Sequence, residues 1–459
     1  MYNRHTWVLA ASAYWRASFA APTPTQPLHD RGLVGELLNP VESLVHGVAT
    51  GLVGDATAAA LVFSDILHDI AATVPTNSPA DIDEVFTLVQ DIFTPTPTDL
   101  YENVVDLVAN SLSPGDLENV FESYSTGYNS ENNNNAREPD SVVYPSASDK
   151  DAPYSLSESQ LRQAIYIPSG FTYGEKPPVI LVPGTGAKGG ENFGSNFIPL
   201  FTGVDYADPV WLNIPGFLLD DAQVNAEYVA YAINYISGIS KSKKVSVLGW
   251  SQGNLDIQWA NKYWPSTVKN VNKHIAMSPD YHGTQLAKAL CPDFPTLPCA
   301  PSVLQQEYNS NFVTQLRKNG GDSAYVTTTN VFSVTDEIVQ PQAEPGASAH
   351  QDDVRNVGVT NNELQSICNG KPAGIFYTHE GVLYNPIAFA LAKDTLINDG
   401  PGLTSRIDLD GLCQELATEG LSLTDVVATE GTIAVAAAAI LLYPNKLVEE
   451  PPLKAYATY

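Results

Sequence analysis

Hydrophobic positions in the first quarter of the chain recur every three or four residues, the spacing of one face of an α-helix. A further amphipathic run opens with Asp-Ile-Asp-Glu at 81–84, which places carboxylates where the dipole of a helix N-terminus favours them. These acids also suggest a calcium site, but the glycine and the distal glutamate of an EF-hand loop do not follow. The pattern predicts a small acidic helical region over 21–123, carried by Leu33, Leu37, Leu38, Val41, Leu44, Val45, Ala58, Leu61, Val62, Ile66 and Leu67.

The pattern changes twice beyond this region. Residues 124–154 are rich in Asn, Ser, Asp and Pro and poor in apolar side chains, which predicts a flexible linker open to proteases. From 155 to 459, short β-branched runs alternate with helical stretches. Widely separated strands with helices between them predict a mostly parallel sheet. The predicted strands lie at 179–182, 245–248, 331–334 and 375–377.

The N-terminus is typical of a secretory signal. Arg4 precedes an apolar stretch at 6–15 and a small-residue pattern at 17–21, so we expect a signal peptide over 1–20 that is cut after Ala20. Arg16 interrupts the pattern, and an ordinary frayed terminus remains the alternative. No later stretch has the length of a transmembrane helix, since the most apolar one, 432–443, is too short to span a bilayer.

The distribution of charge also distinguishes the N-terminal region from the rest of the chain. The 459 residues include 51 acidic and 23 basic side chains, which give a formal charge of −28. This balance excludes sequence-independent binding of nucleic acid, which requires Lys and Arg to neutralise phosphates, and opposes attraction to anionic membranes. No Lys or Arg occurs from 32 to 136. A hydrophobic content of 44% supports a buried core, so we expect a soluble, acidic, globular protein.

The sequence Gly-Trp-Ser-Gln-Gly at 249–253 directly follows a predicted strand and precedes a helical pattern that continues to Tyr263. A strand, a tight turn with serine at its tip and a helix form the nucleophile elbow of α/β-hydrolases. Glycine is expected on both sides of this turn, because a Cβ beside the strained serine would collide with the adjoining strand and helix. An ordinary glycine-flanked turn is the alternative, and the strand–turn–helix context favours Ser251 as a nucleophile.

A second glycine-rich stretch, Pro-Gly-Thr-Gly-Ala-Lys-Gly, occupies 183–189 after another predicted strand. It matches the dinucleotide-binding pattern G-x-G-x-x-G, but the residues after Gly189 are poor helix formers, so no helix N-terminus meets a pyrophosphate. Asp205 lies near the distance expected for a ribose-binding acid but ends no convincing strand. Such a loop instead directs main-chain N–H groups toward a developing oxyanion, and Thr185 adds a hydroxyl. A plain turn is the remaining alternative.

The acid and the base of an α/β-hydrolase follow its serine in that order. Two histidines, His350 and His379, lie beyond both Ser251 and Asp336, the best acid candidate, which follows a predicted strand. His350 lies in a polar stretch and is interpreted as a solvated loop residue. His379 follows another predicted strand, from which a base projects over the sheet edge. We therefore predict a triad of Ser251, Asp336 and His379, with Glu337 as the backup acid.

Together these segments resemble the Candida antarctica lipase B family of fungal lipases, in register from about 178 to 329 and on to about 457. The string Thr-Asp-Glu-Ile-Val-Gln-Pro-Gln at 335–342 matches the acid loop of the family and is the most specific part. The other matches are 182–186 with the oxyanion loop, 250–253 with the elbow, and 279–281 and 283–284 with the segment after the next strand. The resemblance says nothing about residues 22–150.

The resemblance implies an α/β-hydrolase fold over 155–459, with a mostly parallel central sheet flanked by helices. The roles that it implies are nucleophile for Ser251, general base for His379, orienting acid for Asp336, and oxyanion hole for Thr185 and Gln252. The substrate-pocket positions that it implies are Trp250, Asp280, Gln305 and Ile338. It implies neither a metal nor a cofactor.

The four cysteines allow three pairings, and their spacing does not choose among them. The resemblance pairs Cys368 with Cys413, which leaves Cys291 and Cys299 as the natural second pair at the pocket entrance. The loop over 286–301 departs from the family, which has a shorter helix there, so the resemblance leaves the substrate size open. Four free thiols in a cytosolic protein are the alternative.

These features predict a secreted, monomeric lipase or carboxylesterase that acts through an acyl-enzyme, at a lipid–water interface or in solution, and transfers acyl groups to alcohols. An amidase or polyesterase with the same triad is the nearer alternative, and a non-catalytic binding protein of the same fold is the other. The alanine-rich stretch at 425–442 is interpreted either as a lipid-contacting flap or as a buried helix. Region 21–123 is an inhibitory pro-segment, a binding module or a structural addition.

Overall fold

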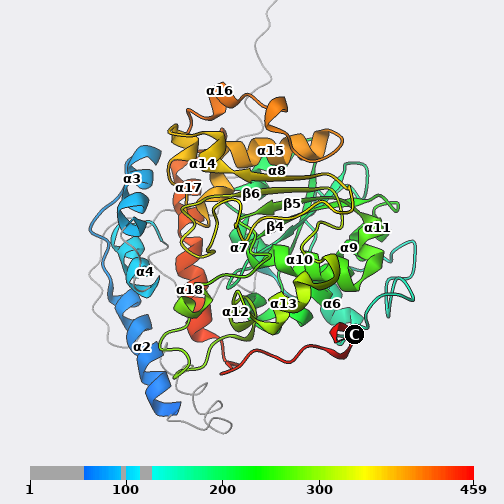
Figure 1. Ribbon diagram of the computed structural model, residues 1–459, viewed down its shortest axis with the longest axis horizontal. Coiled ribbons are helices and arrows are strands. Elements are labelled where there is room, and N and C mark those ends of the chain that lie inside the picture. Colours follow the sequence, from blue (N-terminus) through cyan, green and yellow to red (C-terminus); the bar gives the residue numbers. More distant parts are fainter. Residues whose placement is uncertain (1–55, 95–99, 114–126, 459) are drawn as a thin grey trace, which may run out of the picture.

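The computed structural model describes residues 56–94, 100–113 and 127–458, so the expected signal peptide and the first part of the expected helical region, 21–55, lie outside the described residues (Figure 1). A seven-stranded sheet in the order β1-β3-β2-β4-β5-β6-β7 forms its centre. Only β1 runs antiparallel to its neighbour, which confirms the mostly parallel sheet. The strands are β1 Ile165–Tyr166, β2 Pro178–Val182, β3 Asp208–Leu212, β4 Val245–Trp250, β5 Val271–Met277, β6 Thr328–Phe332 and β7 Val359–Glu363.

Helices cover both faces of this sheet (Figure 1). Successive side chains of a strand point to opposite faces, so Ile180 and Val182 of β2 join the core beneath α9 and α10. Val179 and Leu181 join the core beneath α8, α15 and α18. The helices beyond residue 154 are α6 Glu158–Gln163, α7 Gly189–Asn192, α8 Phe197–Phe201, α9 Ala222–Ile239, α10 Gln252–Tyr263, α11 Pro265–Asn270, α12 Pro301–Gln305, α13 Asn311–Arg317, α14 Leu364–Ile367, α15 Pro386–Ile397, α16 Leu409–Leu412, α17 Leu423–Glu430 and α18 Thr432–Leu442.

Short 3₁₀ helices connect many of these elements. They are η1 Gly127–Asn129, η2 Pro215–Leu218, η3 Ala287–Leu290, η4 Lys318–Gly320, η5 Pro372–Gly374, η6 Gly381–Tyr384, η7 Thr404–Arg406 and η8 Ala455–Ala457. Two of the connections carry candidate site residues. The loop after η3 contains the first cysteine pair, and the loop between η5 and η6 contains His379.

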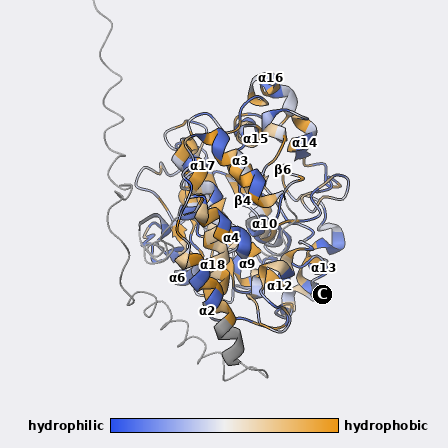
Figure 2. Cartoon of the chain, turned by 90° about the vertical axis from the view of Figure 1, so that its left-hand side faces the viewer, coloured by the Kyte–Doolittle hydropathy of each residue, from blue (hydrophilic) through white to orange (hydrophobic). Residues whose placement is uncertain are grey.

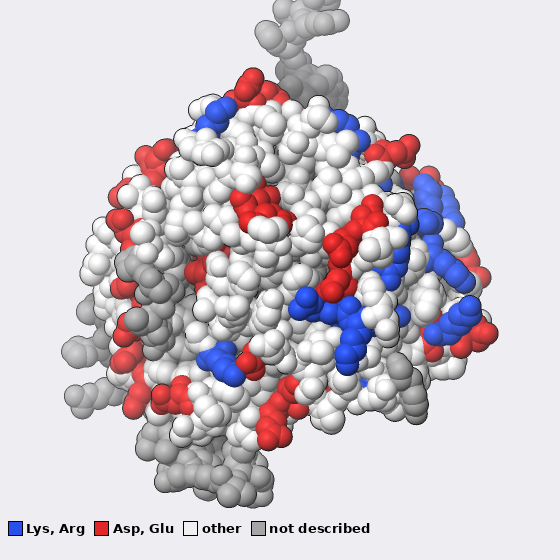
Figure 3. Space-filling model, in the orientation of Figure 1, with Lys and Arg blue, Asp and Glu red and all other residues white. Residues whose placement is uncertain are grey.

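Three N-terminal helices, α2 Ala56–Ala72, α3 Ile82–Phe93 and α4 Leu100–Ala109, lie along α17 and α18 (Figures 1 and 2). Asp81 caps α3, because its carboxylate accepts the N–H of Glu84 at 2.9 Å. The buried faces of α3 and α4 are continuous with the core beneath α17 and α18. Acidic side chains follow the outer edge at which Figure 1 places these helices (Figure 3).

The described part of the expected linker, 127–154, runs along the surface of the α/β unit that contains the sheet. The carbonyl of Tyr128 accepts the indole N–H of Trp211 at 2.7 Å, and the N–H of Asp140 donates to the carbonyl of Gly238 at 3.1 Å. Lys188, on the loop after β2, forms an ion pair of 2.7 Å with Glu131. Hydrogen bonds and ion pairs therefore hold this segment, which has little apolar surface of its own.

The strand predicted at 375–377 is wrong. These residues form a loop between η5 and η6, and Ile375 is 46% exposed. The hydroxyl of Thr335 replaces a neighbouring strand, since it donates to the carbonyl of Tyr377 at 2.9 Å and accepts the N–H of the same residue at 3.0 Å. The Thr335 side chain thus helps to hold the loop that leads to His379.

Within the described residues, one helical stretch, Leu423–Leu442, is long and apolar enough to cross a membrane, with a mean hydropathy of 1.7. However, 78% of its 18 most apolar consecutive residues are buried inside the protein, as in the core helix of a globular domain. It comprises α17 and α18, which meet at Gly431. Of the two interpretations of 425–442, the buried helix agrees with this arrangement.

Candidate active site

Ser251 lies at a sharp turn between the end of β4 and the start of α10. Its φ of 53° and ψ of −132° are a backbone conformation that side-chain-bearing residues rarely adopt. The neighbouring glycines are required by space, because a Cβ on Gly249 would lie 2.3 Å from Oδ1 of Asn254. A Cβ on Gly253 would lie 2.5 Å from the carbonyl oxygen of Val182. The turn therefore has the strained geometry that the sequence pattern predicts.

His379 lies beside this turn, on the loop before η6. Its ring faces that of Trp250 at a centroid distance of 4.9 Å, and its carbonyl accepts the indole N–H of Trp250 at 3.0 Å. The hydroxyl of Ser278, just after β5, donates to the same carbonyl at 2.8 Å. These contacts place the imidazole over the carboxyl ends of β4 and β5.

Asp336 is the carboxylate that contacts the imidazole. Its Oδ2 lies 2.7 Å from Nδ1 of His379, and its Oδ1 accepts the N–H groups of Ile338 at 2.9 Å and Val339 at 2.7 Å. Burial lowers the pKa of His379, but the charge and hydrogen bond of Asp336, with the charges of Glu337 and Asp280, raise it above its ordinary value. Nε2 of His379 has no hydrogen-bond partner among the described residues.

The two other candidates for acid and base do not take these positions. Glu337 contacts the main chain of His379 rather than its ring, since its Oε2 accepts the His379 N–H at 2.8 Å. His350 lies on a surface loop, where its Nδ1 is 2.8 Å from Oε1 of Glu344.

The glycine-rich loop after β2 passes directly over the serine turn. A Cβ on Gly184 would lie 2.9 Å from the Cβ of Ser251, so only glycine allows this approach. The hydroxyl of Thr185 lies 2.8 Å from Oε1 of Gln252 and 3.0 Å from Oε1 of Gln306. The structure thus brings Thr185 and Gln252 together beside Ser251.

Gln306 also contacts Thr185 and Gln252. The sequence analysis did not predict it and named its neighbour Gln305 as a pocket residue instead. The Gln305 amide points to the start of α9, where Nε2 donates to Oδ1 of Asp221 at 2.7 Å and Oε1 accepts the N–H of Ala222 at 2.7 Å. One residue turns a side chain by about 100° around a helix. Nothing in the sequence pattern distinguishes adjacent glutamines at the end of α12.

The remaining predicted pocket residues lie beside the triad candidates. Ile338 is buried and contacts Asp336 through its main chain. Asp280 is fully buried, and neither of its carboxyl oxygens has a partner among the described residues. Burial raises the pKa of Asp280 to about 7, although the nearby His379 charge opposes this rise. Burial thus favours the neutral form of the Asp280 carboxyl.

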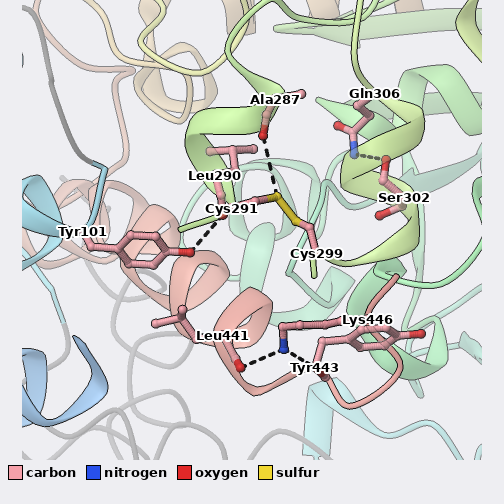
Figure 4. The surroundings of a disulfide bond; sticks show 10 residues. All are labelled: Tyr101, Ala287, Leu290, Cys291, Cys299, Ser302, Gln306, Leu441, Tyr443 and Lys446. Atoms are coloured by element: carbon pink, nitrogen blue, oxygen red, sulfur yellow. Dashed lines mark hydrogen bonds between the residues drawn. A yellow bond between two sulfur atoms is a disulfide. The ribbon is translucent and has the colours of Figure 1, made fainter. Parts of the chain in front are cut away.

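Both expected disulfides are present, Cys291–Cys299 and Cys368–Cys413. The first closes the loop between η3 and α12 and lies near α4 and the end of α18 (Figure 4). In the same view, Tyr101 of α4 points toward this loop, and its hydroxyl donates to the carbonyl of Leu290 at 2.9 Å. The N-terminal helices thus contact the loop that the sequence places at the pocket entrance.

The dinucleotide-binding interpretation of 183–189 finds no geometric support. The helix that begins at Gly189 has four residues, and Lys188 at its N-cap makes no side-chain capping hydrogen bond. Among residues 56–94, 100–113 and 127–458, no group of three or more His, Cys, Asp or Glu side chains is arranged to hold a metal ion.

No protein-family model matches the chain. Lipase B of Pseudozyma antarctica is 36% identical over 313 residues, which are 68% of this chain and 87% of that protein. The crystal structure of Aspergillus fumigatus lipase B matches with a TM-score of 0.81 and 46% identity, over 92% of this chain and 99% of that one. These similarities confirm the predicted fold, and the chain therefore belongs to the lipase B family, whose members are ester-hydrolysing enzymes of the α/β-hydrolase fold.

Proposed function

We propose that this protein hydrolyses carboxylic esters of lipids through an acyl-enzyme on Ser251, with His379 as general base and Asp336 as orienting acid. The contact of 2.7 Å between Nδ1 of His379 and Oδ2 of Asp336 carries the proposal. It directs the Nδ1 proton to Asp336 and leaves Nε2, on the other side of the ring, to accept the serine proton.

The reaction follows from these roles. Oγ of Ser251 attacks the ester carbonyl as Nε2 of His379 takes its proton, and Asp336 stabilises the imidazolium. The main-chain N–H groups of Thr185 and Gln252, with the Thr185 hydroxyl, donate to the oxyanion. The alcohol leaves with the proton from His379. Water, deprotonated by His379, then hydrolyses the acyl-enzyme, and an alcohol in place of water gives transesterification.

A phosphonate that carries a p-nitrophenyl leaving group tests the nucleophile. We expect the full chain to release one equivalent of nitrophenol, and mass spectrometry to find the phosphonyl group on the peptide that contains Ser251. Modification of a different serine would contradict the proposal. Parallel assays with p-nitrophenyl esters and p-nitroanilides of the same acyl groups separate an esterase from an amidase, and we expect turnover of the esters only.

We further propose that the protein is secreted as a monomer and works at lipid–water interfaces. The support for secretion is the signal-like pattern at 1–20 and the two disulfides, since such bonds persist in oxidising compartments. The support for a lipid substrate is the family to which the chain belongs.

We also propose that helices α2–α4, the N-terminal cover, restrict access to the active site as a pro-segment would. The cover contacts both the loop of the first disulfide, through Tyr101 and Leu290, and the loop of the base. On the base loop, the ring of Tyr377 packs edge-on against Phe86 of α3 at 5.4 Å, two residues before His379.

Cleavage between the cover and the catalytic domain tests this role. We expect that a protease site inserted within 114–126, followed by cleavage and removal of the cover, raises the rate on long-chain esters several-fold and that on short-chain esters less. The uncut variant is the control, and thermal unfolding checks that the domain persists. An unchanged or lower rate would leave the cover as a structural addition or a binding module.

A further inference from the structure

Three glutamates form a row beside the main chain of His379. They are Glu337 on the acid loop, Glu380 directly after His379, and Glu430 at the end of α17. Glu380 and Glu430 are fully buried, and so is Oε1 of Glu337. The proposed triad uses none of them, although an ionised carboxylate is costly to bury without a partner.

The two ends of this row have ordinary hydrogen-bond donors, and its middle has none. Oε2 of Glu337 accepts the N–H of His379 at 2.8 Å, and Oε1 of Glu430 accepts the hydroxyl of Tyr384 at 2.6 Å. Among the described residues, no hydroxyl, amide or basic group donates to either oxygen of Glu380. Its carboxyl group instead lies within hydrogen-bonding reach of those of Glu337 and Glu430.

Such contacts require protons, because an ionised carboxylate only accepts hydrogen bonds. Two hydrogen bonds among three carboxyls need two protons, which leaves at most one negative charge on the row. Burial raises the pKa of Glu380 well above its ordinary value, and the charges of the other two glutamates add to this rise. Burial also raises the pKa of Glu337 and of Glu430 to about 7. Burial therefore favours the protonated form of the carboxyls in this row.

The groups around the row fit this assignment. The other titratable groups that act on it come from the acid loop, the base loop and η6, and they are Asp336, His379, Tyr377 and Tyr384. Of these, only His379 carries a positive charge when protonated. Fully ionised glutamates would thus place three more negative charges beside a histidine that Asp336 already contacts, and His379 would retain its proton to a higher pH.

We propose that Glu337, Glu380 and Glu430 form a proton-sharing carboxyl chain that positions the main chain of His379 and limits the negative charge around its imidazole. They are positioning residues, since only Glu337 contacts His379, and it does so through the main-chain N–H. The inference rests on the proposed role of His379 as the base. The protonated Glu380 donates to Glu337, which keeps Oε2 of Glu337 oriented toward that N–H.

The test is the pH profile of kcat/KM for a soluble p-nitrophenyl ester. The acid limb reports the pKa of His379, which must be neutral to accept a proton. A negative charge on Glu337 raises that pKa, so Glu337→Gln is expected to move the acid limb to lower pH by about half a unit. Glu415→Gln changes an exposed glutamate by the same substitution and is expected to leave the limb in place.

A pair of substitutions at Glu380 tests the hydrogen bonds of the chain. Glu380→Ala removes both contacts and is expected to lower kcat about tenfold with KM within twofold. Gln donates through its amide and accepts through its carbonyl, so Glu380→Gln is expected to recover most of the rate. If Glu380→Ala does not fold, the pH profile of Glu337→Gln still tests the carboxyl chain, because a purely structural role of Glu337 would not move the acid limb.

The outcomes separate this inference from the proposed function. An unmoved acid limb in Glu337→Gln, or equal rates for the two Glu380 variants, overturns the carboxyl chain while Ser251-dependent activity stands. Activity that does not depend on Ser251 overturns both.

Discussion

Replacement of Ser251 by alanine is expected to lower kcat for ester hydrolysis by roughly 10⁶-fold, to the residual rate that the oxyanion hole and substrate binding provide. Without the Ser251 hydroxyl, His379 has no serine proton to accept and the oxyanion donors have no serine-bound intermediate to stabilise. The fold is expected to persist, since the Ser251 side chain makes no capping hydrogen bond to α10. Hydrolysis of p-nitrophenyl esters of short and long acyl chains measures the loss, and the chain-length ratio of the wild type shows how open the pocket is.

Ser366→Ala is the matched control, because Ser366 is exposed on α14 and its hydroxyl donates to Glu363. We expect this variant to keep the wild-type rate. A Ser251→Ala variant that folds and retains more than a tenth of the wild-type kcat would show that another group is the nucleophile.

Asp336→Asn is expected to lower kcat by about 10⁴-fold. An asparagine amide in this position donates to Nδ1 of His379, so the ring proton moves to Nε2, which then cannot accept the proton of Ser251. The side-chain carbonyl of asparagine still accepts the N–H groups of Ile338 and Val339, so the loop is expected to keep its shape. Steady-state kinetics and thermal unfolding of the same preparation separate the two effects.

The control for this substitution is Asp353→Asn, because Asp353 also accepts two main-chain N–H groups of its own loop, from Val357 at 2.8 Å and Gly358 at 3.0 Å. Equal loss of activity in both variants would assign the effect to loop geometry. A loss below tenfold in Asp336→Asn would exclude Asp336 as the group that orients His379.

The features that the sequence predicted well are those specified by neighbours along the chain. The run at 245–248 becomes β4 and the Gly-Trp-Ser-Gln-Gly turn follows it, because strand periodicity and the space that glycine leaves are local properties. The helix at Asp81 begins where its capping carboxylate predicts. The strands β1, β3, β5 and β7 were not predicted. β1 has only two residues, and the other three contain proline or several polar residues, which hide the apolar run that marks a buried strand.

Only the tertiary structure decided how distant segments meet. The residues at 375–377 have the composition of a strand, yet a hydroxyl from Thr335 satisfies their main chain and no strand forms. The composition predicted a linker over 124–154, because composition reports only how much apolar surface a segment can bury. The hydrogen-bond and charge partners that the described part, 127–154, finds on the rest of the protein depend on the tertiary structure.

The sequence by itself therefore determined the sheet class, the elbow and the order of serine, acid and histidine. The tertiary structure decided that Gln306 rather than Gln305 faces Thr185. A sequence motif does not show which of two adjacent residues at the end of a helix points toward the site. The tertiary structure also decided that Glu337, Glu380 and Glu430 share one row beside the main chain of His379. The physical reason is the same in both cases, because hydrogen-bond partners and pKa values depend on burial and distance between residues far apart in the chain.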